Sequence, residues 1–329
     1  MSANAATIDV GGRLRGHARQ LVAWRDSGIV VAFVVLFVVL SVSSDVFLTK
    51  TNLLHILDQQ SGILIMAAAG TLVLIAGGFD LAIGATFALS GVVAAKLAVD
   101  ISPWLALTAG MGTGLAVGLA NGLLTTVGRV NSLIGTLATG FIIRGLAPIV
   151  TAGAIITVSG ASAPDFQTLG NGHLLGVKYT IWVMAAFVGA MWLVLSRTTL
   201  GRYIYAAGAN PEAARLAGVR VAAVRTGTFV LSGLAAGLAG VMAASTVATG
   251  QPGAGAGIEF TVIAGIVVGG TSIMGGQGAV WRSVLGVLFI ALIDNGFTLL
   301  GLDPIYQRMA QGAIILLAVS IDAWGRDSR

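Results

Sequence analysis

The chain has 329 residues, of which 56% are hydrophobic and only 9% are charged, so it has too few polar side chains to cover the surface of a soluble globular protein. The formal net charge of +5 would suggest a nucleic-acid partner for a soluble chain, but here the arginines flank apolar runs, so we expect no nucleic-acid binding. The absence of cysteine excludes disulfides, thiolate nucleophiles and cysteine metal sites, and the three histidines are too scattered to share a metal ion.

A membrane-spanning helix needs about 20 mainly apolar residues, and the chain offers a series of such runs. They predict an all-α integral membrane protein with about ten transmembrane helices, although weak second and eighth runs leave nine or eleven open. The predicted spans are 28–44, 53–77, 81–99, 103–127, 131–152, 177–196, 222–248, 258–270, 279–300 and 306–323. No nucleophile, base or metal cluster recurs at helical spacing within them, so we expect neither a catalytic residue nor a metal site.

The tail 1–27 carries four arginines ahead of the first span, and no small-residue cleavage site follows them, which is typical of an uncleaved signal anchor. Positive charge marks the loops that stay in the cytoplasm. With ten spans that start inside, most basic residues fall on the cytoplasmic side. We therefore predict that both termini are cytoplasmic, that 28–323 is a single transmembrane domain, and that 324–329 is a C-terminal tail.

The string GGFDLAIG at 77–84 places a carboxylate and three glycines between the second and third spans. Gly77 and Gly78 can end one helix, and Asp80 can accept hydrogen bonds from the first free amides of the next, which predicts an N-cap at a re-entrant break. A carboxylate in lipid is costly, so the same break, together with Gly84, is a candidate for lining a solute path. The two interpretations are compatible.

Glycine recurs at every fourth position of the fourth span. The positions are Gly110, Gly114, Gly118 and Gly122. Small residues at this spacing let helix backbones approach closely in lipid, and we expect packing within the bundle rather than a dimer interface. Gly233 and Gly237 repeat the pattern more weakly in the seventh span.

The segment 196–225 interrupts the apolar runs with five arginines, which places it on the cytoplasmic side. Within it, Asn210, Pro211 and Glu212 predict a helix start: asparagine caps, proline suits the first helical position, and glutamate is favourable near the positive end of the helix dipole. A cytoplasmic loop of this length between spans indicates a docking surface for a partner.

A second glycine-rich break lies at 250–259 and ends on Glu259. It follows the seventh span as the first break follows the second span, and in the ten-span arrangement these two spans point in opposite directions. This favours an inverted internal repeat of glycine-broken helices whose breaks mark the functional centre. Gly255 and Glu259 are therefore candidates for the solute path, although Glu259 can equally be a capping or interfacial acid.

The string GGTSIMGGQG at 269–278 is rich enough in glycine to suggest a phosphate-binding loop. It lacks the lysine that must follow the last glycine of a P-loop to reach the β- and γ-phosphates. We expect a tight turn at the inner face instead, and no ATP on this chain. The connections also leave no room for a separate soluble domain, so any enzymatic activity must lie either within the helical bundle or on another polypeptide.

Two of the polar side chains inside predicted spans are singled out by their depth. Arg144 is in the fifth span, where we expect it to pair with a carboxylate or carbonyl and to hold helices together rather than to contact a solute. Asn295 is near the end of the ninth span and is a further candidate for the solute path.

The strings GGFDLAIG, GRYIYAAGANPEAARLAGV and GGTSIMGGQG, in this order and spacing, resemble the sugar-type permease subunits of bacterial ABC importers, such as those for ribose, xylose or galactose. The resemblance runs from about residue 47 to residue 322. It implies a multi-pass permease of the bacterial inner membrane that pairs with a second permease copy or homologue, a cytoplasmic ABC ATPase and an extracytoplasmic sugar-binding protein. It also implies that ATP and Mg²⁺ bind to the partner ATPase, that membrane lipid surrounds the chain, and that this chain holds no cofactor.

The resemblance further implies that 196–225 is a cytoplasmic coupling loop with a short helix that sits in a groove of the ATPase. The matching positions are Gly201, Gly208, Asn210, Ala213, Ala214 and Gly218. Pro211, Glu212 and Arg215 belong to the same short helix and complete the expected coupling residues.

We therefore predict an alternating-access permease that imports a monosaccharide or polyol. The chain departs from the resembled family at Ala82, Ala85, Thr261 and Gln277, and these changes bear on the solute more than on the fold. The rivals are an ion-coupled secondary transporter that uses Asp80 and Glu259, an ABC permease for a nucleoside or amino acid, a channel, and an intramembrane enzyme.

Overall fold

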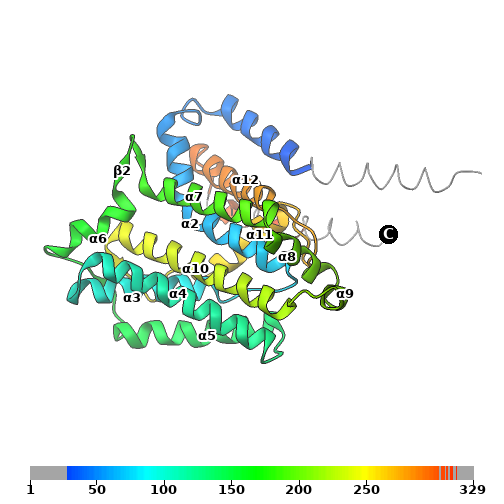
Figure 1. Cartoon of the computed structure of the whole chain (residues 1–329). Coiled ribbons are helices and arrows are strands. Elements are labelled where there is room, and N and C mark those ends of the chain that lie inside the picture. The colour runs from blue at the N-terminus through cyan, green and yellow to red at the C-terminus, as the bar shows by residue number, and fades with distance from the viewer. Residues whose placement is uncertain (1–27, 304, 308, 310–311, 314–315, 317–329) are drawn as a thin grey trace, which may run out of the picture.

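The computed structural model describes residues 28–303, 305–307, 309, 312–313 and 316, and it shows a bundle of long helices (Figure 1). A first helix, Gly28–Ser43, precedes the labelled elements. The long helices that follow are α2 (Lys50–Ile75), α3 (Ile83–Asp100), α4 (Pro103–Thr126), α5 (Ser132–Thr151), α7 (Tyr179–Arg197), α10 (Val221–Val247) and α12 (Val280–Leu299). The shorter helices are α6 (Ser162–Asn171), α8 (Thr199–Ala209), α9 (Pro211–Leu216) and α11 (Ile258–Val268).

Four two-residue strands form two small antiparallel ladders. β1 (Ile156–Thr157) pairs with β4 (Thr249–Gly250), and β2 (His173–Leu174) pairs with β3 (Val177–Lys178). The β2–β3 hairpin turns through Leu175 and Gly176, whose φ angles of 54° and 75° are those of a type I′ turn. Figure 1 shows α6 and β2 at one end of the bundle and α8 and α9 at the other.

Seven of these helices, the long ones from α2 to α12, are long and apolar enough to cross a membrane. The first helix and α11 are shorter apolar helices that coincide with the first and eighth predicted spans. Most of the tenth predicted span, 306–323, and the predicted tails 1–27 and 324–329 lie outside the described residues. The all-α membrane class is confirmed, while the number ten and the inverted repeat stay predictions.

The glycine row of α4 packs against α10, as expected for contacts within the bundle. A side chain at Gly114 would overlap the Gly233 carbonyl and lie 2.6 Å from Gly237 Cα, and one at Gly118 would overlap the Phe229 carbonyl. The row therefore meets the second glycine pair, Gly233 and Gly237, backbone to backbone. The sequence predicted close packing of each row, and the structure shows that the two rows are partners.

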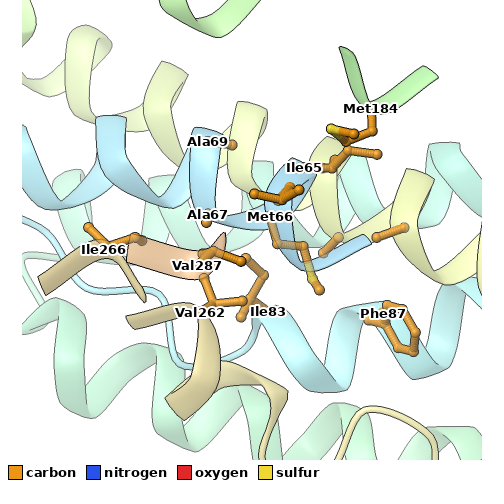
Figure 2. Close-up of a cluster of buried hydrophobic side chains, with 14 of the residues drawn as sticks. Ile65, Met66, Ala67, Ala69, Ile83, Phe87, Met184, Val262, Ile266 and Val287 are labelled. Atoms are coloured by element: carbon orange, nitrogen blue, oxygen red, sulfur yellow. The ribbon is translucent and has the colours of Figure 1, made fainter. Parts of the chain in front are cut away.

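The largest buried cluster joins both halves of the chain (Figure 2). Ile65 and Met66 of α2 lie with Ile83 and Phe87 of α3 and with side chains of α7, α10, α11 and α12. Since lipid is as apolar as these side chains, their close packing rather than escape from water stabilises the arrangement. Side chains next to both predicted breaks belong to or pack against this cluster, Phe79 and Ile83 at the first break and Ala254 and Ile258 at the second.

Candidate coupling region and solute path

The predicted coupling loop folds into α8 and α9 at one end of the bundle (Figure 1). The Asn210 side chain accepts hydrogen bonds from the amides of Glu212 at 3.1 Å and Ala213 at 3.0 Å, and Pro211 is the first helical residue. The predicted helix start is therefore confirmed. At the other end, Gly218 has a φ of 85°, and the amides of Gly218 and Val219 donate to the carbonyls of Arg215 and Ala214, which is a Schellman ending.

The short helix α9 presents most of its side chains outward. Glu212 and Arg215 are exposed and pair with each other at 2.8 Å, a contact that adds little stability in water. Ala213 is exposed, whereas Ala214 is buried against the bundle. Leu216 is 84% exposed. An apolar side chain beside charged ones on a helix outside the spans is a surface that a partner could cover.

The glycines of α8 allow close backbone contacts. A side chain at Gly201 would overlap the carbonyl of Leu195 in α7. A side chain at Gly208 would overlap the carbonyl of Ile75, the last residue of α2, and would lie 2.7 Å from the amide of Gly276. The predicted coupling residues Gly201 and Gly208 therefore attach the loop to two spans, and only glycine fits at either position.

The string 269–278 forms the expected turn, between α11 and α12, and it contacts α8. The hydroxyl of Tyr205 donates to the carbonyl of Gly278 at 2.7 Å. Burial raises the pKa of Tyr205 above its usual value of 10.0, so the phenol keeps its proton and its donor function at neutral pH. The sequence did not point to Tyr205, because a single tyrosine in a helical segment carries no distinctive pattern.

The first break follows α2, as predicted, but Asp80 is not the N-cap of α3. Gly77 and Gly78 end α2 in a Schellman motif, with amides that donate to Leu74 and Val73 carbonyls. The N-cap residue of α3 is Ala82, which makes no side-chain cap bond. The expected N-cap is wrong because the chain continues without helical structure as far as Ala82, so α3 begins three residues after Asp80.

Asp80 instead bridges the break to α10. One carboxylate oxygen accepts from the amide of Ala82 at 3.1 Å, and the other accepts from the hydroxyl of Ser232 at 2.7 Å. On the opposite side, Thr136 and Ser132 of α5 bind the backbone of the same break: Thr136 Oγ1 accepts from the Leu81 amide at 2.9 Å, and Ser132 Oγ accepts from the Phe79 amide at 3.0 Å. The break is thus held by hydrogen bonds from both sides.

The second break ends in an ion pair. Arg144 of α5 donates to both carboxylate oxygens of Glu259, at 3.0 and 3.2 Å, in the first turn of α11. A side chain at Gly84 would overlap the Glu259 carboxylate and lie 2.6 Å from the carbonyl of Gly255. The predicted pairing of Arg144 with a carboxylate is confirmed, and three predicted path residues, Gly84, Gly255 and Glu259, lie together.

Three neighbouring cavities extend from the end of the bundle that carries β2 toward this second break. The first has a volume of about 340 Å³ and a polar lining that includes Lys50, His173 and Asp58. Asp58 also lines the second cavity, of about 320 Å³, where its carboxylate accepts from Lys178 at 2.7 Å and from Thr180. These charged and hydroxyl groups make a polar mouth.

The second and third cavities share Phe87, Ala243, Val247 and Ile258, so they form one cleft. The third cavity has a volume of about 290 Å³ and is lined by Gln251 and Gly255 as well. Such volumes lie at the lower end of those that hold small molecules. The cleft leads from the polar mouth to the glycines beside Glu259.

Asp80 and Asn295 do not line this cleft. Asp80 borders a separate small cavity with Gly78 and Phe79. The amide of Asn295 pairs with that of Asn52, donating to it at 2.8 Å and accepting from it at 3.2 Å, which joins α12 to α2. The place of Asn295 in a solute path stays a prediction. Among the described residues, no group of three His, Cys, Asp or Glu side chains could hold a metal ion.

Residues 52–319 match the sequence model of the family described as "Branched-chain amino acid transport system / permease component". The chain belongs to this family of permeases. It is 37% identical over 294 residues to the ribose import permease protein RbsC of Escherichia coli (strain K12), an alignment that covers 89% of this chain and 92% of that protein. No solved structure matches the chain significantly.

Two further relatives agree with this membership. The ribose import permease protein RbsC of Bacillus subtilis (strain 168) is 39% identical over 290 residues, covering 88% of this chain and 89% of that protein. The L-arabinose ABC transporter permease protein AraH of Azospirillum brasilense is 38% identical over 318 residues, covering 96% and 92%. The expected kinship with sugar-type permeases of ABC importers is confirmed.

Proposed function

We propose that this chain is the membrane-spanning permease subunit of an ATP-driven, binding-protein-dependent importer for a monosaccharide, with a pentose as the first candidate, or for a related polyol. The observation that carries the proposal is the 37 to 39% identity, over most of the chain, to permeases named for ribose and L-arabinose. A nucleoside or an amino acid is the less favoured solute, because these relatives are named for sugars.

The cleft between α2, α3, α10 and α11 supports a path for a small neutral solute. Its polar positions carry hydroxyl and amide groups, which can exchange hydrogen bonds with sugar hydroxyls without a net charge. They are Gln59, Ser61, Thr180, Thr246, Thr249 and Gln251. The charged groups gather at the mouth, where a binding protein would deliver the solute from outside the cell.

Alternating access follows from the two breaks. In this proposal the glycine-linked segments around Asp80 and Gly255 act as bending points, because unwound backbone costs little to rearrange where it is not part of a helix ladder. Gly77, Gly78 and Gly84 belong to the same machinery. Glu259 holds the second break closed through its ion pair with Arg144. The ion-coupled alternative is disfavoured because the relative from Azospirillum brasilense is named as an ABC transporter permease.

In this proposal ATP is hydrolysed on a separate polypeptide. We assign α8 and α9, from Gly201 to Gly218, to contact with a cytoplasmic ABC ATPase that binds ATP and Mg²⁺, and Leu216 on α9 is the apolar side chain that the ATPase would cover. This orientation places the polar mouth outside, both termini in the cytoplasm, and the exposed apolar helix faces against lipid or a second permease copy in the bacterial inner membrane.

The test is reconstitution of the chain with its ATPase and its binding protein in liposomes. Uptake of radiolabelled ribose and L-arabinose is compared with that of a nucleoside and of leucine, with and without ATP, and with a protonophore. We expect ATP-dependent, protonophore-resistant uptake of one sugar. Uptake by the chain alone, driven by an ion gradient, would overturn the proposal.

A further inference from the structure

Three backbone segments far apart in sequence meet beneath the predicted coupling loop: the end of α2, the end of α8 and the turn between α11 and α12. The amide of Gly276 donates to the carbonyl of Ile75 at 2.8 Å. A side chain at Gly276 would lie 2.8 Å from Ala209 Cα, and one at Gly275 would lie 3.0 Å from Gly77 Cα. Glycine at these positions lets the three backbones touch. A displacement of α8 must therefore also displace the end of α2.

One side chain ties two of these segments together. Arg225, in the first turns of α10, donates from Nε to the carbonyl of Ala76 at 2.9 Å and from Nη2 to the carbonyl of Ala207 at 3.3 Å. Ala76 is the C-cap residue of α2, and Ala207 lies in the last turn of α8. The guanidinium thus binds two carbonyls without partners in their own helices and faces the negative ends of two helix dipoles.

The same face of α10 follows the first break along its length. Arg225 binds the break at Ala76, Phe229 packs against Gly78, where a side chain would lie 3.2 Å from its ring, and Ser232 binds Asp80. The spacing i, i+4, i+7 places all three on one side of a helix. The break therefore lies along α10, attached at both ends, and the end nearest α8 is attached through Arg225.

We propose that Arg225 is a positioning residue that transmits movement of α8 and α9 to the break that carries Asp80. This inference rests on the proposed function, in which an ATPase displaces α8 and α9. Because the planar guanidinium holds two donors at a fixed angle, Ala207 and Ala76 move as one unit while both bonds last. Lysine keeps the charge but has no fixed fork, and glutamine keeps a donor but has neither the charge nor the reach.

The structure separates this role from general support of the fold. Arg225 is half-buried, and it contacts backbone carbonyls at two helix ends rather than another side chain. Arg220, five residues earlier at the N-cap of α10, is exposed and carries the same charge near the same loop. Arg220 is therefore the matched control for charge at the cytoplasmic end.

The test uses the full complex of this chain, its ATPase and its binding protein in liposomes, with ATP hydrolysis and sugar uptake measured in the same vesicles. In Arg225→Gln we expect the number of ATP molecules hydrolysed per sugar to rise about tenfold, a change of the size that coupling positions produce. The number of ATP molecules hydrolysed per sugar in Arg225→Lys should lie between those of the parent complex and Arg225→Gln. In Arg220→Gln this number should equal that of the parent complex. An unchanged ratio in Arg225→Gln, or an equal rise in Arg220→Gln, would overturn the inference.

A second measurement reports the break itself. The chain has no cysteine, so Phe79→Cys, at a half-buried position of the break, provides a single thiol whose rate of maleimide labelling can be followed. We expect ATP to change this rate in the parent complex and not in Arg225→Gln. An ATP-dependent rate that survives in Arg225→Gln would overturn the inference even if uptake is lost. If the parent complex itself takes up no sugar, the proposed function fails instead, which is a separate outcome.

Discussion

The two glycine-rich breaks look alike in sequence, since each is a run with glycine that leads to an acid, but they are stabilised differently. The first acid, Asp80, accepts hydrogen bonds from uncharged donors, the Ser232 hydroxyl and the Ala82 amide. The second acid, Glu259, forms an ion pair with Arg144. The first break is attached along α10 to the end that carries α8, whereas the second lines the cleft that opens at the other end. The same sequence pattern, a glycine-rich run ending in an acid, therefore occurs at two sites with different surroundings. The side chain that pairs with the acid distinguishes the two sites.

The largest difference between the breaks should appear when the ion pair is cut. Glu259→Ala leaves the part-buried Arg144 guanidinium without its counter-charge. Removing one partner of a fully buried pair costs about 3 to 5 kcal/mol, and the cost here is smaller because the Arg144 side chain is 29% exposed. We expect a strongly lowered unfolding temperature in mild detergent. The measurement is size-exclusion chromatography of samples heated to a series of temperatures. The exchange Arg144→Glu with Glu259→Arg should recover part of the loss, and no recovery would argue against the pair.

The contact between the two breaks gives the next largest effect. Gly84→Ala places a methyl group on the Glu259 carboxylate and the Gly255 carbonyl, and overpacking of this kind costs about 1 to 3 kcal/mol. Thermal unfolding and sugar uptake should both fall. Gly112→Ala, where a side chain meets nothing within 4 Å, is the control and should behave as the parent chain. Equal stability of the two variants would show that the breaks do not touch.

A smaller effect is expected at the first break. Ser232→Ala removes one hydrogen bond to the Asp80 carboxylate, and bonds to charged groups contribute about 1.5 to 3 kcal/mol. Because α5 still holds the break through Thr136, we expect the lower end of this range by thermal unfolding, together with altered uptake. Ser232→Thr, which keeps the hydroxyl, should restore the parent behaviour if the bond and not the volume matters.

The smallest effect on stability is expected at the exposed pair on α9. Glu212→Gln breaks its contact with Arg215, and exposed pairs contribute about 0 to 1 kcal/mol. Thermal unfolding should stay unchanged, while binding of the ATPase, measured by co-purification, should weaken if α9 is its docking helix. A marked drop in unfolding temperature would show that α9 supports the bundle rather than a partner.

Several features could be predicted because they depend on residues close in the chain. The start of α9 needs only Asn210 and Pro211, and the end of α2 needs only Gly77 and Gly78, so both followed from local rules. The expected capping by Asp80 failed because α3 begins only at Ile83, so one Asp80 oxygen reaches only the Ala82 amide. The other oxygen binds Ser232, which lies 152 residues away. A nearby donor could be foreseen, whereas a donor on another helix could not.

Long-range partners formed the other class of unpredicted features. The sequence indicated that Arg144 needs a partner, but not that the partner is Glu259, which lies 115 residues away. The row from Gly110 to Gly122 had to pack closely, but nothing local indicated Gly233 and Gly237 as its opposite face. Arg225 was only one of five arginines in a loop. Its two carbonyl partners come from helix ends that meet only in the folded bundle.

The sequence by itself determined that this is an α-helical membrane protein, because hydrophobic length and charge placement act locally and can be counted along the chain. Its three glycine-rich strings also carried the resemblance to sugar-type permeases. Only the tertiary structure decided which acid pairs with which cation, which glycine rows touch, and how the coupling loop reaches the first break. These depend on distances between residues far apart in sequence, and such distances are set by the packing of whole helices rather than by any single segment.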